Sequence, residues 1–338
     1  QALLKESTFT ITTAHQPNIF TGHLYFIYKI LHAIKLCDVL KKEIPDHYFV
    51  PIFYMGSEDA DLDELGHIYI DDEKLAWETN QRGAIGRMNT KGLEKIIKRL
   101  ESEFGTMPHG AEMVQLCRQA YLEHDSIQSA TLFLVNELFK DYGLLVLIPD
   151  NANLKKLFAD VIQKELTEQF SHPLIKDTTA KLSKHYKAQT EGREINLFYL
   201  DNEGRRERIE FEKNKYLVRN LQLSFTQDEI ISELDKHPER FSPNVILRGL
   251  LQERILPNIA FIGGGGELAY WFELKPVFQA ANIFYPVLLL RNSFLLIEKR
   301  ERYLIEKLQL TIEDLFKPAT ELQEKITRRL TGNRLTLI

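Results

Sequence analysis

Residues 9–56, FTITTAHQPNIFTGHLYFIYKILHAIKLCDVLKKEIPDHYFVPIFYMG, contain the pattern that decides the fold. The first part, 9–15, is rich in β-branched residues, as expected of a strand. After a turn-like segment, residues 23–42 place apolar side chains at helical spacing. Residues 48–56 then form a short apolar run that suits a strand buried on both faces. This order of strand, helix and strand predicts parallel strands joined by a crossover helix.

The same alternation continues along the chain. We expect helices near 91–104, 109–123, 126–140 and 151–166, with a buried strand in GLLVLIPD at 143–150. Farther on come a helix at 242–256, a strand at 255–263, a glycine-rich turn with a helix at 264–281, and a strand at 285–290. The sequence therefore predicts an α/β fold built on a parallel sheet.

Two segments differ from this alternation. Residues 195–219 predict a β-hairpin around Asn202-Glu203-Gly204, and Thr226 with Glu229 forms a capping box that opens a helix. From Ser293 onward the sequence is charged and helical with sparse apolar positions, such as Leu295, Leu296, Leu304 and Leu308, which is typical of a helix that packs on another helix. Because the chain starts without Met and stops just after a helical stretch, we expect it to be part of a longer polypeptide.

These segments predict a division into four parts. A core with a helical insertion occupies 1–185, a β-rich insertion 186–237, the remainder of the core 238–297, and the first C-terminal helices 298–338.

Composition narrows the class of protein. Of 338 residues, 44% are hydrophobic and 27% are charged, which is ordinary for a globular protein. The net charge of −5 gives no reason to expect a nucleic-acid or anionic-membrane partner. The longest apolar stretch, 286–297, is short and carries Arg291, so it is not expected to span a membrane. The first ten residues lack the pattern of a signal peptide. The two cysteines lie in helical patterns and suit buried thiols in a reducing compartment. We therefore expect a cytoplasmic protein without a metal site of its own.

The first candidate site is His15-Gln16-Pro17 with Thr21-Gly22-His23, where the first strand gives way to the first helix. Ligands of open α/β sheets bind at the carboxyl ends of strands, and helix N-termini attract anions. The alternative is a turn built by Pro17 and Gly22, with the histidines as polar caps. The segment matches neither a Walker A loop nor the dinucleotide pattern.

The second candidate is the acidic segment directly after the second buried strand. Carboxylates crowded in this way repel one another unless a ligand amine, a cation or water compensates. An EF-hand is excluded, because Glu64 replaces the required glycine and Ile70 replaces the required glutamate. The alternative is a solvated acidic loop. The acidic residues are Glu58, Asp59, Asp61, Asp63 and Glu64.

The third candidate is the run Gly263-Gly264-Gly265-Gly266-Glu267, followed by Tyr270 and Trp271. Glycines let a ligand approach backbone amides closely and allow positive φ angles. From Gly264 the run matches G-x-G-x-x-A, but the acidic residue of a dinucleotide site is missing about twenty positions on. Arg248 and Arg291, the latter followed by Asn292, are able to bind a carboxylate or phosphate, or to form surface salt bridges.

Taken together, long blocks of the chain resemble the signature blocks of the bacillithiol-synthesis cysteine-adding ligases. The blocks are HQPNIFTGHLYFIYK at 15–29, PIFYMGSEDADLDELGHIYI at 51–70, and SPNVILRGLLQERILPNIAFIGGGGELAYWFELKPVF at 242–278 with YPVLLLRNS at 285–293. WETNQRGAIGRM at 77–88 and the strand at 143–150 are also similar. His23 and Gly249 stand where the family pattern has proline.

The resemblance implies a fold and an activity. The fold would be a Rossmann-like core similar to class I aminoacyl-tRNA synthetases and nucleotidyltransferases, with insertions and a C-terminal helical coiled coil that pairs two subunits into a homodimer. The activity would be the last step of bacillithiol biosynthesis, in which a carbon–nitrogen ligase joins L-cysteine to glucosaminyl-malate. A carboxylate must be activated before it forms an amide, and ATP with Mg²⁺ is the natural source. Acyl phosphate and acyl adenylate both remain open, as does the use of ATP itself.

Resemblance and residues together predict the site. We expect catalytic roles for His15, Gln16, Glu58, Asp59 and Asp61. Substrate-binding roles are expected for Thr21, Gly22, Arg248, Gly263, Gly264, Gly265, Gly266, Glu267, Tyr270, Arg291 and Asn292. Two rival functions remain: a dinucleotide-dependent oxidoreductase that uses the glycine-rich turn, and a non-catalytic assembly module that binds a nucleotide only as a regulator.

Overall fold

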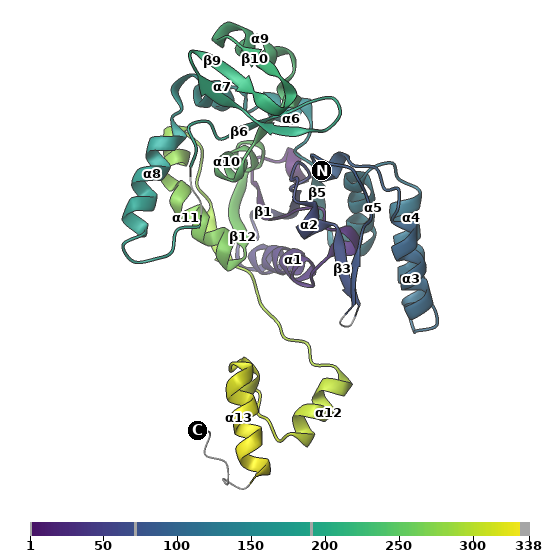
Figure 1. The fold of residues 1–338 in the computed structure, drawn as a ribbon. Coiled ribbons are helices and arrows are strands. Elements are labelled where there is room, and N and C mark those ends of the chain that lie inside the picture. The colour runs from purple at the N-terminus through teal and green to yellow at the C-terminus, as the bar shows by residue number, and fades with distance from the viewer. Residues whose placement is uncertain (1, 71–72, 190–191, 332–338) are drawn as a thin grey trace. The chain divides into compact units, whose positions relative to one another are not determined.

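A five-stranded parallel sheet forms the centre of the computed structural model, which describes residues 2–70, 73–189 and 192–331 (Figure 1). The strands are β1 (Thr8–His15), β2 (Tyr48–Met55), β5 (Leu145–Leu147), β12 (Asn258–Gly263) and β13 (Val287–Leu290). Their order is β13-β12-β1-β2-β5, and every neighbouring pair is parallel. The predicted Rossmann-like parallel sheet is confirmed. Since the chain extends the sheet first to one side of β1 and later to the other, the β1/β12 boundary is a topological switch point.

Helices cover both faces of this sheet. Helix α1 (Tyr25–Glu43) buries Phe26, Ile30, Ala33, Ile34 and Cys37 against β1 and β2, and α5 (Ile127–Phe139) joins it. On the other face lie α10 (Val245–Ile255) and α11 (Gly265–Ala280), where the Trp271 ring stacks on Phe261 with 4.4 Å between centroids. A Cβ at Gly249 would lie 3.0 Å from the Trp271 ring, so glycine there permits the close packing of α10 on α11.

The helical insertion lies between β2 and β5. It contains α2 (Leu62–Leu65), the antiparallel pair β3 (His67–Ile70) and β4 (Glu73–Ala76), α3 (Glu94–Phe104) and α4 (Gly110–Leu122). These elements share a core around Trp77 and Tyr121 with α5 and with Ile19.

The second insertion contains α6 (Ala152–Lys156), α7 (Ala159–Glu168), α8 (Ser171–Leu182) and α9 (Gln227–Lys236). Its strands are β6 (Leu197–Leu200), β7 (Arg206–Arg208), β8 (Glu210–Glu212), β9 (Lys215–Val218), β10 (Leu223–Phe225) and β11 (Phe241–Pro243). They form two antiparallel sheets, β11-β6-β7 and β10-β9-β8. Pairing of β6 with β7 confirms the hairpin predicted around Asn202–Gly204, and the Thr226 capping box is also confirmed.

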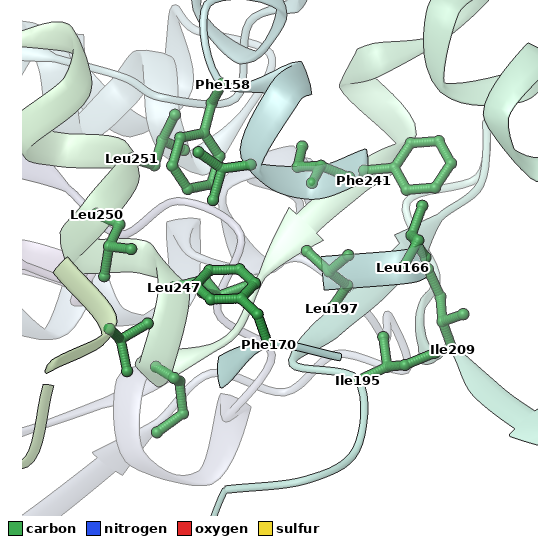
Figure 2. Packing of buried hydrophobic residues seen from close by; sticks show 14 of the residues in the cluster. Phe158, Leu166, Phe170, Ile195, Leu197, Ile209, Phe241, Leu247, Leu250 and Leu251 are labelled. Carbon is green, nitrogen blue, oxygen red and sulfur yellow. The ribbon is translucent and has the colours of Figure 1, made fainter. Parts of the chain in front are cut away.

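The second insertion shares its core with α10. Figure 2 shows Leu247, Leu250 and Leu251 of α10 together with side chains of the insertion, such as Phe158 and Leu197. One helix predicted over 151–166 is in fact two, because the chain leaves helical geometry at Phe158 (φ −115°, ψ 5°), whose side chain is fully buried. This packing fixes the insertion next to the carboxyl edge of the parallel sheet.

Residues Ser293–Ile338 form a separate unit, described here to residue 331. The prediction of helix directly from Ser293 is wrong: α12 (Lys299–Lys307) starts later, so Leu295 and Leu296 precede it. A left-handed Gln309 (φ 48°) follows α12, and Pro318 precedes α13 (Ala319–Leu330). The described residues of this unit thus hold two short α-helices with a 3-10 helix (Glu313–Phe316) between them. Residues 332–338, the end of the predicted coiled-coil segment, lie outside the described residues, as do 1, 71–72 and 190–191.

Both cysteines, Cys37 and Cys117, are buried free thiols, as predicted. Among the described helices none is both long enough and apolar enough to cross a lipid bilayer.

Candidate active site

A cavity of about 750 Å³ opens at the carboxyl edge of the sheet, beside the switch point. It is lined by residues at and just after the ends of β1 and β2, by residues of α1, α10 and α11, and by residues of the second insertion. Its lining includes Ala14, His15, Gln16, Tyr25, Lys29, Tyr54, Gly56, Asp59, Glu64, Gln189, Gly192, Arg193, Phe198, Arg206, Asn244, Val245, Arg248, Glu267 and Tyr270.

His15 is the last residue of β1 and is held between aromatic rings. Its imidazole stacks on Tyr25 with 5.3 Å between ring centroids and lies 5.5 Å from Phe26. Burial, with a further contribution from Lys29, lowers the pKa of His15 to about 3. Nδ1 is buried and makes no hydrogen bond with the described residues. A neutral imidazole carries one N–H, and because Nδ1 is buried, His15 is suited to donate to a ligand oxygen in the tautomer that carries the hydrogen on Nε2.

Asp59 joins two predicted residues in one hydrogen-bonded group. Its Oδ2 accepts from Gln16 Nε2 at 3.1 Å and from Arg248 Nη1 at 3.2 Å. Burial alone would raise the pKa of Asp59, but the Arg248 and Arg206 guanidinium groups outweigh it and hold the pKa at about 2. Both bonds end on Oδ2, which leaves Oδ1 for a ligand. The wall therefore presents an ionised carboxylate beside a guanidinium.

Lys29 and Glu267 form a second ion pair in the cavity. Lys29 Nζ lies 2.6 Å from Glu267 Oε2 and also donates to the Ala14 carbonyl. Burial lowers the pKa of Lys29, and Glu267 acts in the opposite direction. Glu267 Oε2 also accepts from the Gly264 N–H at 2.8 Å. The Gly264 amide, expected to meet a ligand, is thus bonded within the protein.

Glu58 lies behind the cavity wall rather than in it. Its side chain is buried, Oε1 binds Lys155 Nζ, and Oε2 accepts from Ser242 Oγ at 3.0 Å. Lys155 is fully buried and also donates to the Glu239 carbonyl at 2.9 Å. Since both Glu58 oxygens are already bonded, direct contact with substrate stays a prediction that the geometry does not favour.

The other acidic residues separate as well. Asp61 is exposed and caps α2, accepting from the Glu64 N–H at 3.1 Å. Asp61 and Asp63 line a neighbouring depression, whereas Glu64 lines the main cavity. The five carboxylates therefore do not form one cluster: among them Asp59 and Glu64 reach the cavity.

Several predicted substrate-binding residues lie beside the cavity but outside its lining. Thr21 and Gly22 form a left-handed turn (φ 67° and 59°) in which Gly22 N–H donates to the Ile19 carbonyl at 3.0 Å. Arg291 lies with its guanidinium 5.0 Å above the Tyr25 ring, which itself stacks on His15. The rest of this group comprises Gly263, Gly264, Gly265, Gly266 and the exposed Asn292.

The glycine run does not use the positive φ angles that glycine allows. None of Gly263 to Gly266 is among the positive-φ glycines, and Gly264 has φ −72°. Gly263 is packed closely, since a Cβ there would lie 2.9 Å from the Phe261 ring. At Gly265 and Gly266 a Cβ would meet open space.

The open space at Gly265 allows a test of whether a ligand approaches this glycine. Gly265→Val should leave the fold intact, because no neighbour lies within 4 Å of the added Cβ and no positive φ is required. If a ligand approaches the first turn of α11, the branched side chain should abolish turnover. We would compare activity and melting temperature with those of Gly265→Ala, whose single methyl group also meets open space. Near-normal turnover and substrate affinity in Gly265→Val would show that the glycines serve only the turn.

Several lining residues escaped the sequence-based prediction. The sequence did indicate that Lys29 is buried, because Lys29 lies three residues after Phe26 and four before Ala33, on the apolar face of α1. Tyr54 is buried at the end of β2, its hydroxyl has no partner among the described residues, and burial raises its pKa. Arg193, Phe198 and Arg206 come from the second insertion, whose docking on the sheet edge no local pattern predicts.

Comparison with known proteins places these features in a family. A family model described as "Bacillithiol biosynthesis BshC, N-terminal Rossmann-like domain" matches residues 1–292. A protein of Flavobacterium johnsoniae named "Putative cysteine ligase BshC" is 43% identical over 332 residues, covering 98% of this chain and 62% of that protein. Proteins of the same name from Flavobacterium psychrophilum and Christiangramia forsetii are 46% identical (93% and 59% covered) and 42% identical (98% and 62% covered). The chain thus spans about three fifths of the length of these relatives.

Proposed function

The chain belongs to the BshC family of bacillithiol biosynthesis, and from this premise we propose that its cavity is the active site of a ligase that joins L-cysteine to glucosaminyl-malate. The observation that carries the proposal is the ionised Asp59 beside Arg248 and the neutral His15 in one cavity wall. Such a wall suits a zwitterionic amino acid, whose ammonium group needs a carboxylate and whose carboxyl oxygens need hydrogen-bond donors.

In this proposal Asp59 Oδ1 binds the α-ammonium of cysteine, or a Mg²⁺ ion that arrives on a nucleotide. Gln16 and Arg248 hold Asp59 in place through Oδ2. The second possibility requires only one protein carboxylate, because phosphate oxygens and water complete a magnesium shell. A neutral His15 then donates to the carboxyl oxygen on which negative charge grows during acyl transfer.

The bond-forming step needs an activated cysteine carboxyl group. The neutral amine of the glucosamine attacks the carbonyl carbon, a C–N bond forms, and the C–O bond to the activating group breaks. The amine proton must leave, and Glu64 and Glu267 are carboxylates in the cavity that are able to accept it directly or through water. ATP with Mg²⁺ would supply the activating group, and the guanidinium group of Arg248 suits its phosphates.

Incubation of the purified full-length protein tests the proposal. Cysteine, glucosaminyl-malate and ATP with Mg²⁺ should yield bacillithiol, detected as the thiol product by mass spectrometry. Parallel incubations with nicotinamide cofactors test the oxidoreductase alternative. Nucleotide binding without turnover of either kind would favour a non-catalytic assembly module.

Asp59→Asn should raise the KM for cysteine about ten- to hundredfold, since a hydrogen bond to a charged group contributes about 1.5–3 kcal/mol. If Asp59 instead meets a metal, the Mg²⁺ requirement should rise. Steady-state kinetics with each component varied separates the two. Asp63→Asn is the matched control, because Asp63 is an exposed carboxylate of the same segment. Unchanged dependence on both cysteine and Mg²⁺ would leave only a structural role for Asp59.

We also propose that the full-length protein is a homodimer paired through a C-terminal coiled coil. Support comes from exposed apolar side chains in the C-terminal unit, including Leu296, Tyr303, Leu304 and Phe316. Sedimentation of full-length protein should give a dimer at working concentration, and a clean monomer would refute the proposal. We place the reaction in the cytoplasm, where free cysteine is kept reduced.

A further inference from the structure

Arg206 is a cavity cation whose side-chain hydrogen bonds, within the described part of the chain, go to uncharged groups. It extends from β7, where Nε donates to Ser242 Oγ at 2.9 Å and Nη2 donates to the Pro243 carbonyl at 3.1 Å. Its guanidinium lies 3.8 Å from the centroid of the Phe198 ring. Among the described residues it forms no salt bridge, in contrast to Lys29 with Glu267 and Arg248 with Asp59.

Glu58 and Asp59 act on Arg206 electrostatically, but neither carboxylate is bonded to it, so the guanidinium keeps N–H groups for an anionic ligand. Burial, reinforced by Arg248, lowers the pKa of Arg206 to about 10, so the guanidinium still carries its charge at neutral pH. The stacking on Phe198 and the two neutral bonds fix the plane of the guanidinium, which leaves a planar group suited to a carboxylate.

Glu58 fixes the position of Arg206 through Ser242, which is hydrogen-bonded to both side chains. Ser242 is fully buried, and its hydroxyl carries a single hydrogen, which Glu58 Oε2 accepts at 3.0 Å. The Ser242 oxygen is therefore left to accept from Arg206 Nε. Glu58 is in turn bonded to the fully buried Lys155, so its charge and orientation are fixed. The chain Lys155–Glu58–Ser242–Arg206 links the segment after β2 to the insertion.

A second link holds the hairpin that carries Arg206. Arg87 binds Asp150 through two bonds of 2.6 Å and donates to the Asp201 carbonyl at 3.3 Å. Asp150 also lies 3.9 Å from Lys155 Nζ. The β6–β7 hairpin is therefore joined to the same buried network at two points.

We propose that Arg206 binds a free carboxylate of the malate moiety and determines specificity for it, and that Ser242 and Glu58 are positioning residues for Arg206. This inference rests on the proposed function for the identity of the ligand, because glucosaminyl-malate carries two free carboxylates. The second insertion then has a role in substrate binding, because it places Arg206 at the carboxyl edge of the sheet.

Binding of glucosaminyl-malate to the full-length protein, measured by calorimetry without cysteine, tests the inference apart from turnover. The probes are the diacid and its two monomethyl esters. The parent protein should discriminate against one ester. Arg206→Met should weaken binding of the diacid about tenfold or more and remove that discrimination. Arg206→Lys keeps the charge but loses the planar guanidinium group, so its affinity for the diacid should lie between those of the parent protein and Arg206→Met.

Ser242→Ala should weaken binding of the diacid about threefold to tenfold and reduce the discrimination while the KM for cysteine stays unchanged. A purely structural role would lower the melting temperature and leave the preference for the diacid as it was. Arg208→Met is the matched control, since Arg208 is an exposed arginine on the same strand.

The outcomes separate this inference from the proposed function. Discrimination lost in Arg206→Met supports the inference even where no cysteine is added to the sugar. Discrimination that persists in Arg206→Met overturns the inference, even in a protein that makes bacillithiol. A parent protein that binds neither the diacid nor the esters overturns both.

Discussion

His15→Ala should lower kcat about a hundredfold or more, because removal of one donor to a developing oxyanion has effects of that size. His15 stands at the end of β1 with its ring fixed between Tyr25 and Phe26, so its N–H is already oriented before substrate arrives. Its lowered pKa of about 3 means that the imidazole stays neutral from pH 5 to 9. Loss of activity in mild acid should therefore not follow the titration of His15.

The control for this prediction is His23→Ala. His23 is exposed and stacks on Tyr25, the ring that also stacks on His15, with 5.3 Å between centroids. It does not line the cavity. Its loss should change kcat much less. The two variants would be compared in single-turnover experiments with saturating substrates. A His15→Ala protein that folds normally and turns over like the parent would remove His15 from the reaction.

Lys155→Met should lower the free energy of unfolding by about 3–5 kcal/mol, since it leaves a buried carboxylate without its partner. Lys155 is fully buried, binds Glu58, and lies 3.9 Å from Asp150 Oδ1. Urea unfolding of the full-length protein measures the loss. Adding Glu58→Gln to Lys155→Met removes the unpaired charge and should recover part of the stability, which a double-mutant cycle quantifies.

Lys156→Met provides the comparison, because the next residue of α6 is exposed and its replacement should change stability by less than about 0.5 kcal/mol. Equal and small losses in the two lysine variants would show that the Lys155–Glu58 pair adds little to folding. The pair would then also be a weak support for the position of Arg206.

The parallel sheet was predictable because its signals are local. Residues 9–56 contain a strand, an amphipathic helix and a buried strand, each recognisable from its own periodicity. Strand ends also indicated the site, because the carboxyl ends of parallel strands meet at one edge. For this reason His15, Asp59 and Glu267, which are distant in sequence, were expected together and do line one cavity.

What the sequence did not reveal depends on side-chain direction and on docking. Glu58 and Asp59 are adjacent, yet one points into a buried ion pair and the other into the cavity, and composition does not distinguish them. Arg206 reaches the site only because the second insertion packs on α10. In the C-terminal unit, Pro318 marked the start of a new helix, a signal that the overall helical pattern of the segment obscured.

The central claim is that this cavity adds cysteine to glucosaminyl-malate, and metabolite analysis of a strain whose only copy of the gene is deleted tests it most directly. The strain should accumulate glucosaminyl-malate and contain no bacillithiol. The parent gene should restore the thiol, and a gene carrying His15→Ala should restore little of it. Normal bacillithiol in the deleted strain would contradict the claim.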